Sequence, residues 1–148
     1  MDDSLRNALE SLPHGPSFRF VDELRTLDPG REGVGIYRVT GTEEFLAGHF
    51  PGNPMMPGVI LIEAIAQLGG VVAQSDPVHG PLEDLRLTAV RSAKILGAAV
   101  PGDSLEIHVR AEGRMDSLVQ VSGRVTIGDR ELARAVVTLS GNRRETDA

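Results

Sequence analysis

The amino-acid sequence predicts an α+β domain in which one long apolar helix is wrapped by a curved antiparallel β-sheet. Residues 59–73 form an apolar run of helical length that is interrupted only by glycines, Glu63 and Gln67. From Leu85 onward apolar and polar residues alternate, which is the pattern of half-buried strands. A helix that is apolar on every side has to be covered, and an antiparallel sheet is the partner that the rest of the chain offers.

The N-terminal part is expected to form a short helix followed by two strands. Apolar residues recur at helical spacing within residues 4–12, with Ser4 as the candidate N-cap. Residues 18–27 and 34–40 have the composition of strands, and the Asp-Pro-Gly sequence at 28–30 predicts the turn between them.

A loop rich in glycine and proline, residues 41–57, precedes the central helix, and Pro57 suits the first helical turn because its missing N–H costs nothing there. The alternating segments after the helix predict three or four antiparallel strands, with a tight turn at 128–129 before the last of them. We interpret residues 1–140 as a single domain and expect residues 141–148 to form a flexible tail.

Composition excludes several classes of function. The net charge of −6 and the scarcity of aromatic residues argue against nucleic-acid binding, which favours basic surfaces and stacking side chains. The sequence has no cysteine, so disulfides and thiolate metal sites are excluded. No apolar run is long enough to cross a bilayer, and the acidic N-terminus has no leader-like apolar segment. We expect a cytoplasmic protein without a metal site, a cofactor, a nucleic-acid partner or membrane insertion.

The central helix carries the most informative polar residue. Glu63 and Gln67 are four residues apart and therefore share one face of the helix. Apolar neighbours would desolvate Glu63, and desolvation raises the pKa of a carboxyl group. A carboxylic acid that stays neutral at working pH can donate a proton as a general acid.

His49 lies in the preceding loop, where positioned catalytic groups are often found, and imidazole acts as a base near neutral pH. Gly58 and Val59 begin the helix, where free backbone N–H groups could polarise a thioester carbonyl as an oxyanion hole does. Base, acid and oxyanion donors within one segment are compatible with proton abstraction beside a carbonyl and loss of a β-hydroxyl. Structural roles remain open for each residue, and His14, His79 and His108 are expected to be structural.

The segment GHFPGNPMMPGVILIEAIAQLGG closely resembles the signature of the FabZ-type (3R)-hydroxyacyl-[acyl-carrier-protein] dehydratases, which have the hotdog fold. LPHGPSFRFVDEL and SAKILGAAVPGDSLEIHV extend the resemblance over most of the chain. The resemblance implies that His49 removes the α-proton and Glu63 handles the departing hydroxyl. It also implies that the Gly58 amide polarises the thioester and that Gln67 orients the glutamate.

The same resemblance implies an acyl-carrier protein as partner and a homodimer with the site at its interface, and a trimer of such dimers is a common assembly of the family that the chain resembles. His49 and Glu63 would then come from different protomers. The acyl chain would lie in an apolar tunnel lined in part by Phe50, Met55, Met56 and Ile60, with Phe18 and Phe20 as further candidates.

Some positions depart from the family pattern. Leu96 and Gly97 replace basic residues that often precede the VVPGD-like segment, a change that affects docking of an acidic carrier protein. Arg19 stands at a position that is usually aliphatic. Two alternative functions stay open at this point: a hotdog acyl-thioesterase, because a helix carboxylate can also activate water, and a non-catalytic acyl-binding module of a synthase complex.

Overall fold

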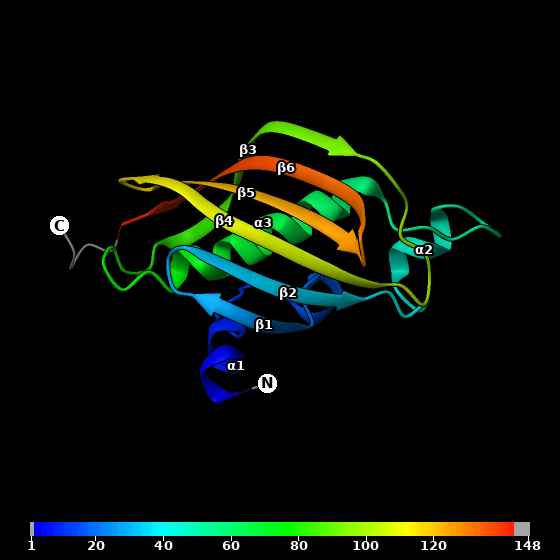
Figure 1. Cartoon of the computed structure of the whole chain (residues 1–148), viewed down its shortest axis with the longest axis horizontal. Helices are drawn as coiled ribbons and strands as arrows, with labels where there is room; N and C mark the ends of the chain where they lie inside the picture. Colours follow the sequence, from blue (N-terminus) through cyan, green and yellow to red (C-terminus); the bar gives the residue numbers. More distant parts are fainter. Residues whose placement is uncertain (1, 144–148) are drawn as a thin grey trace.

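The computed structural model describes residues 2–143 and contains one antiparallel sheet and one long helix (Figure 1). Six strands pair in the order β1-β2-β4-β5-β6-β3, and every neighbouring pair is antiparallel. The elements, in chain order, are α1 (Asp3–Leu9), a 3-10 helix (Pro16–Phe18), β1 (Glu23–Asp28), β2 (Glu32–Arg38), α2 (Glu44–Gly48), α3 (Gly58–Gln74), β3 (Glu83–Ile95), β4 (Ser104–Met115), β5 (Leu118–Ile127) and β6 (Arg130–Asn142).

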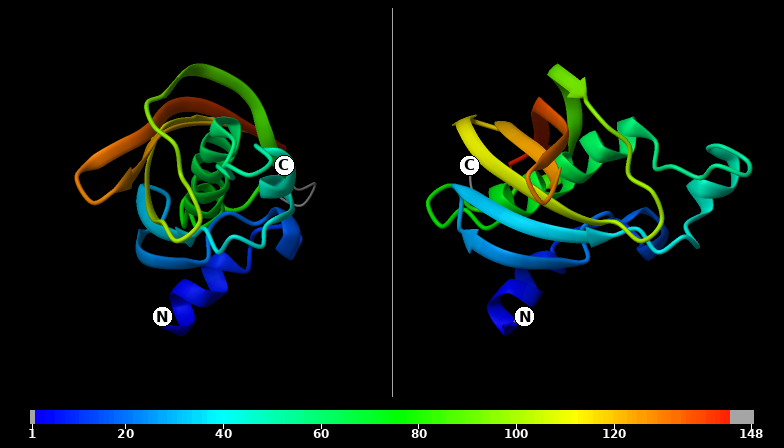
Figure 2. Two further views of the ribbon diagram at one scale, coloured as in Figure 1. Left: turned by 90° about the vertical axis from the view of Figure 1, so that its right-hand side faces the viewer. Right: turned by 45° about the vertical axis from the view of Figure 1, so that its right-hand side comes forward.

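The sheet curves around α3, as the sequence predicts, and the two further views in Figure 2 show the helix inside this curve. Most α3 side chains are buried against the sheet. Two glycines allow the close approach: a Cβ at Gly69 would lie 2.9 Å from Val121 Cγ1, and one at Gly123 would lie 2.6 Å from Ile65 Cγ2. None of the helices within residues 2–143 is long and apolar enough to cross a membrane.

One stripe of α3 is left only partly covered by the sheet. Its members lie in the first two turns and then seven and eleven residues after Glu63, which places them on one side of the helix. They are Val59, Ile60, Glu63, Gly70 and Gln74. The expected all-round burial of this helix is therefore incomplete, and Glu63 belongs to the stripe that faces away from the sheet.

The N-terminal region differs from the expectation. The first strand begins at Glu23 rather than at residue 18, because Gln67 binds the backbone before it: Phe20 N–H donates to Gln67 Oε1 at 2.8 Å, and Gln67 Nε2 donates to Phe18 O at 2.9 Å. The first helix is capped by Asp2, whose carboxylate accepts from Leu5 N–H, and not by Ser4.

Two further boundaries differ. The short helix α2 lies within the segment expected to be a loop, and β6 continues to Asn142, two residues into the expected tail. Arg143 is the last described residue, and residues 144–148 of that tail lie outside the described residues.

Strand β3 forms an edge of the sheet. It pairs with β6 and, within residues 2–143, with no strand on its other side. Its residues are largely exposed, including Val90 and Ile95, and Leu96 directly after it is also exposed. A long edge strand with exposed apolar side chains is a ready surface for pairing with another chain.

Candidate active site

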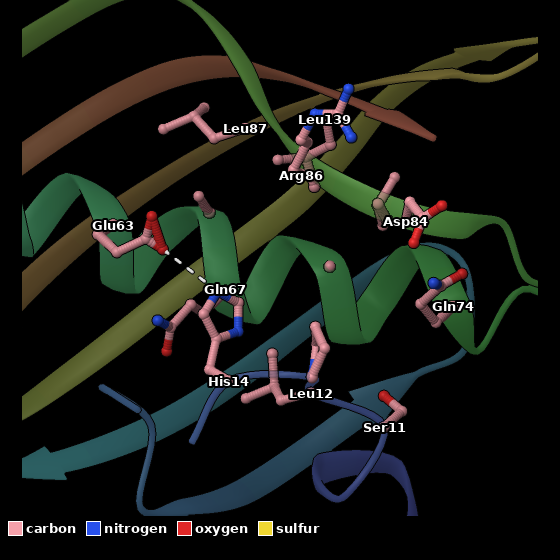
Figure 3. A pocket seen from close by; sticks show the side chains of 14 residues that line it. Ser11, Leu12, His14, Glu63, Gln67, Gln74, Asp84, Arg86, Leu87 and Leu139 are labelled. Carbon is pink, nitrogen blue, oxygen red and sulfur yellow. Dashed lines mark ion pairs between the residues drawn. The ribbon is translucent and has the colours of Figure 1, made fainter. Parts of the chain in front are cut away.

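Glu63 lies in a pocket of about 420 Å³ between α3, the start of β3 and the segment after α1 (Figure 3). The residues that line the pocket come from all three segments and from β6. They are Ser11, Leu12, Pro13, His14, Glu63, Ala66, Gln67, Gly70, Gln74, Asp84, Leu85, Arg86, Leu87 and Leu139. Three members of the partly covered stripe of α3, Glu63, Gly70 and Gln74, thus lie in one wall of the pocket.

The Glu63 carboxyl is partly withdrawn from water, with 22% of its side chain exposed. Burial raises its pKa, while the charge of His14 and a hydrogen bond with Gln67 act in the opposite direction. The net shift is upward, in the direction that the sequence predicts. A raised pKa favours the protonated carboxyl, which is the form that can donate a proton to a leaving group.

His14 is the residue at this site that sequence reasoning missed. Its Nε2 lies 4.0 Å from Glu63 Oε2, and Figure 3 shows the ring directed at the carboxylate. Its Nδ1 is buried and has no hydrogen-bond partner. One feature of the sequence indicated a role for His14 in the site: like His49, it lies among glycine and proline residues outside regular structure.

Arg19 holds the segment that carries His14. Its guanidinium Nη2 donates to Leu12 O and to His14 O, both at 3.3 Å. These bonds fix the backbone on each side of Pro13 against the pocket. Arg19, at a position that is usually aliphatic in the family pattern, therefore holds in place the pocket wall opposite Glu63.

Gln67 is 2% exposed, and both ends of its amide are bound by the backbone of Phe18 and Phe20. These bonds fix the amide beside Glu63, one helical turn away. Gln67 thus connects α3 to the segment before β1, and its contribution to the Glu63 pKa comes from an amide that cannot rotate freely.

His49 immediately follows α2, in a loop that is folded on itself. Met55 N–H donates to His49 O at 2.8 Å, and His49 Nδ1 lies 3.0 Å from Met55 O. Since a carbonyl oxygen can only accept, Nδ1 carries the proton in this contact, and Nε2 of the neutral ring is left with a free lone pair. The loop is joined to the body by Met56 N–H, which donates to Ala99 O at 2.8 Å.

The start of α3 offers backbone donors. Pro57 occupies the N-cap position and supplies no side-chain cap to the first turn, which begins at Gly58 and Val59. Ile95 packs against Gly58 so closely that a Cβ there would lie 2.5 Å from Ile95 Cδ1. The helix dipole is positive at this end, so an oxygen that gains negative charge would be stabilised here.

Within one chain these parts are separate. His49 does not line the pocket that contains Glu63, and neither do Phe50, Met55, Met56 and Ile60. Met56 is a core residue, whereas Phe50 and Val59 are exposed. Figures 1 and 2 show α2 and the loop after it extending beyond the end of the sheet. Within residues 2–143, no group of three His, Asp or Glu side chains could hold a metal ion.

Comparison with known proteins gives a consistent result. Residues 12–136 match the family model described as the FabA-like domain. The chain is 35% identical over 140 residues to a 3-hydroxyacyl-[acyl-carrier-protein] dehydratase FabZ of Clostridium acetobutylicum, covering 95% of this chain and 90% of that one. It is 36% identical over 143 residues to the protein of the same name from Nitratidesulfovibrio vulgaris, covering 95% and 92%.

Solved structures share the fold. The dehydratase heterocomplex ApeI:P from Xenorhabdus doucetiae superimposes with a TM-score of 0.76 at 16% identity, over 96% of this chain and 93% of that one. A hypothetical thioesterase with coenzyme A from Streptococcus pneumoniae gives a TM-score of 0.61 at 17% identity, over 82% and 90%. The fold is therefore the hotdog fold that the sequence resemblance implies, and it is common to dehydratases and thioesterases.

Proposed function

Because the chain belongs to the FabA-like domain family, we propose that it is a lyase that dehydrates (3R)-3-hydroxyacyl thioesters on an acyl-carrier protein to trans-2-enoyl thioesters. The observation that carries this proposal is Glu63, a carboxyl with a raised pKa at the wall of an elongated pocket in a chain that also keeps the His49 loop. Fatty-acid synthesis or a related pathway would supply such substrates.

His49 is the proposed base. Its Nε2 removes the proton on C2 of the substrate, while the bond from Nδ1–H to Met55 O supports the imidazolium that forms. The electrons of the C2–H bond become the C2–C3 double bond. The bond between C3 and the hydroxyl oxygen breaks, and Glu63 donates the proton that turns the leaving hydroxyl into water.

The first turn of α3 is the proposed oxyanion site. Charge develops on the thioester oxygen as C2 loses its proton, and the N–H groups of Gly58 and Val59 would receive that oxygen. Pro57 leaves these donors without a side-chain cap. Gln67 would keep the Glu63 side chain in place through its fixed amide.

The active unit is proposed to be a homodimer in which each site takes His49 from one protomer and Glu63 from the other. Three features support this arrangement: His49 lies outside the Glu63 pocket, its loop extends beyond the sheet, and within residues 2–143 one edge of β3 is unpaired and carries exposed apolar residues. The tunnel residues Phe50, Met55, Met56 and Ile60 would then meet the pocket of the partner. A trimer of dimers is a further possible assembly, and the cytoplasm is the proposed location.

The test is turnover of 3-hydroxybutyryl thioesters on pantetheine and on an acyl-carrier protein, followed by enoyl absorbance and product mass. Enoyl product from the wild type and a loss of at least about a hundredfold in His49→Ala and in Glu63→Gln are expected. Release of free thiol without enoyl product would instead assign the chain to the thioesterases. Binding of the acyl-carrier protein without turnover would indicate a non-catalytic module.

The shared site has its own test. When His49→Ala and Glu63→Gln chains are refolded together, a mixed dimer contains one site with both natural residues. Activity should therefore reappear in the mixture although each variant is inactive alone. A mixture that forms mixed dimers, as shown by mass spectrometry, and stays inactive would exclude a site shared between protomers.

A further inference from the structure

The pocket extends from Glu63 along one face of α3. Glu63, Gln67, Gly70 and Gln74 follow one another on that face, and eleven residues of helix rise by about 16 Å. Figure 3 shows Glu63 and His14 at one end, and Gln74 and Asp84 at the other. The pocket is therefore a channel that leads away from the proposed site of proton transfer, with room for an extended medium-length acyl chain.

The middle of this channel is apolar. Gly70 leaves its floor open, since a Cβ there would meet only Leu85 Cδ2, at 3.9 Å. Leucine side chains from the segment after α1, from β3 and from β6 form the walls. They are Leu12, Leu85, Leu87 and Leu139. This part of the channel is suited to methylene groups.

Gln74 lines the far end of the channel. Its Oε1 accepts from Leu82 N–H at 2.8 Å, and its Nε2 donates to Leu82 O at 2.7 Å. Both ends of the amide are thus occupied by the backbone just before β3. The side chain is held as a fixed wall and has little capacity left to bind a substrate.

Asp84 and Arg86 line the same channel with charged groups that are not engaged. Within residues 2–143, no hydrogen bond or ion pair involves either side chain, whereas the Gln74 and Ser11 side chains, which line the same pocket, are both bonded to backbone. Both lie where the pairing of β3 with β6 is irregular, and Asp84 has a φ of 54°. Backbone in this left-handed region is uncommon for residues other than glycine and is often found at ligand sites.

We propose that this channel selects medium-length 3-hydroxyacyl chains that carry a hydroxyl or oxo group at their far end, with Asp84 and Arg86 as the residues that recognise it. The inference rests on the proposed dehydratase function and adds the substrate class. Both side chains are exposed to solvent, so a plain alkyl end placed beside them would displace part of their hydration without replacing its hydrogen bonds. A terminal hydroxyl donates to Asp84, and a terminal oxo group accepts from Arg86, so either restores a bond.

The experiment compares three pantetheine thioesters: 3-hydroxybutyryl, 3-hydroxydodecanoyl, and 3-hydroxydodecanoyl with a terminal hydroxyl. We expect the wild type to prefer the terminally hydroxylated chain over the plain chain by about tenfold in kcat/KM, the effect of one hydrogen bond to a charged group. Asp84→Gly should remove most of this preference. Glycine adopts the positive φ of this position without strain, so the variant deletes the carboxylate and leaves the backbone unchanged.

Asp116→Gly is the matched control. Asp116 is also an exposed aspartate with a positive φ, of 58°, but it lies between β4 and β5 and does not line the channel. This variant should keep the wild-type preference. Gly70→Leu tests the path of the chain, since a side chain in the middle of the channel should lower the ratio of dodecanoyl to butyryl turnover at least tenfold.

Equal turnover of the two dodecanoyl substrates by the wild type would overturn the proposed selectivity. Retention of the preference in Asp84→Gly would overturn the role of Asp84, and an unchanged ratio in Gly70→Leu would exclude the channel as the path. Each of these results requires enoyl product from at least one substrate. Absence of product from all three substrates, the butyryl thioester included, would refute the dehydratase function itself. This outcome differs from a loss of selectivity, in which enoyl product still forms.

Discussion

Gly58→Ala tests whether the start of α3 is part of the catalytic machinery. The new Cβ would lie 2.5, 2.9 and 3.1 Å from Ile95 Cδ1, Cγ2 and Cγ1. Carbon atoms at an optimal separation are about 3.5–4.0 Å apart, so the first turn and Ile95 must move apart by roughly 1 Å. A displacement of that size at a reacting centre costs on the order of a hundredfold, and we expect kcat/KM to fall by this factor, or about 2.7 kcal/mol.

The fold should tolerate this change. Alanine is favoured over glycine in a helix by up to about 1 kcal/mol, which offsets part of the cost of the contact. We therefore expect a melting temperature within a few degrees of the wild type, so that the loss of activity cannot be attributed to unfolding.

A second substitution makes the reasoning falsifiable. Ile95→Ala removes all three atoms that the new Cβ would meet, so the double variant should recover most of the lost activity relative to Ile95→Ala alone. The assay is enoyl formation from the 3-hydroxybutyryl thioester. Wild-type activity in Gly58→Ala, or a double variant no better than Gly58→Ala, would refute the geometric argument.

Three further predictions concern the other residues of the site. In His14→Gln the pKa of Glu63 should rise further, because the His14 charge that opposes the effect of burial is lost. Glu63 acts as an acid when it is protonated, so the alkaline limb of the kcat/KM–pH profile should move to higher pH. A shift of this limb to lower pH would contradict the prediction. Glu63→Gln should be inactive yet at least as stable as the wild type at neutral pH. The pKa of Glu63 is raised in the folded state, so the wild type loses stability as pH rises past the pKa of this carboxyl in the unfolded chain. In denaturant melts the stability advantage of the variant should therefore disappear in acid. Gln67→Leu leaves Phe18 O and Phe20 N–H without partners and should lower the free energy of unfolding by about 2–4 kcal/mol, as measured by urea titration. A decrease in this free energy of less than about 0.5 kcal/mol would mean that water replaces the amide.

The fold was predictable because its strongest signals are long. The apolar run that became α3 and the period-two alternation of the strands after it each extend over many residues, and the sheet curves around the helix accordingly. The boundary of β1 was not predictable, because Gln67 competes with the sheet for the backbone of Phe18 and Phe20 from 49 and 47 residues away. Helix α2 has only five residues and leaves too short a pattern to recognise.

The site was predictable only in part, for a related reason. Glu63 stands out as a charge in an apolar helix, and the upward direction of its pKa follows from that context. His14, in contrast, acquires its position from Arg19 and from the packing of the N-terminal segment, and neither is visible in local spacing. Asp84 and Arg86 reach the pocket only because β3 lies across from α3, a contact that sequence order does not reveal.

The strand order also determines when the protein can finish folding. Strand β3 is made before β4 and β5, yet its partner in the sheet is β6, the last strand within the described residues, with Glu83 opposite Asn142. During synthesis the edge of β3 that pairs with β6 must therefore stay unpaired until β6 has left the ribosome. Contacts between such distant segments form slowly and leave strand edges open to aggregation. Because β3 and β6 both line the pocket that contains Glu63, this pocket would form only after β6 has been made, and deleting β6 would remove the pocket together with the pairing of β3.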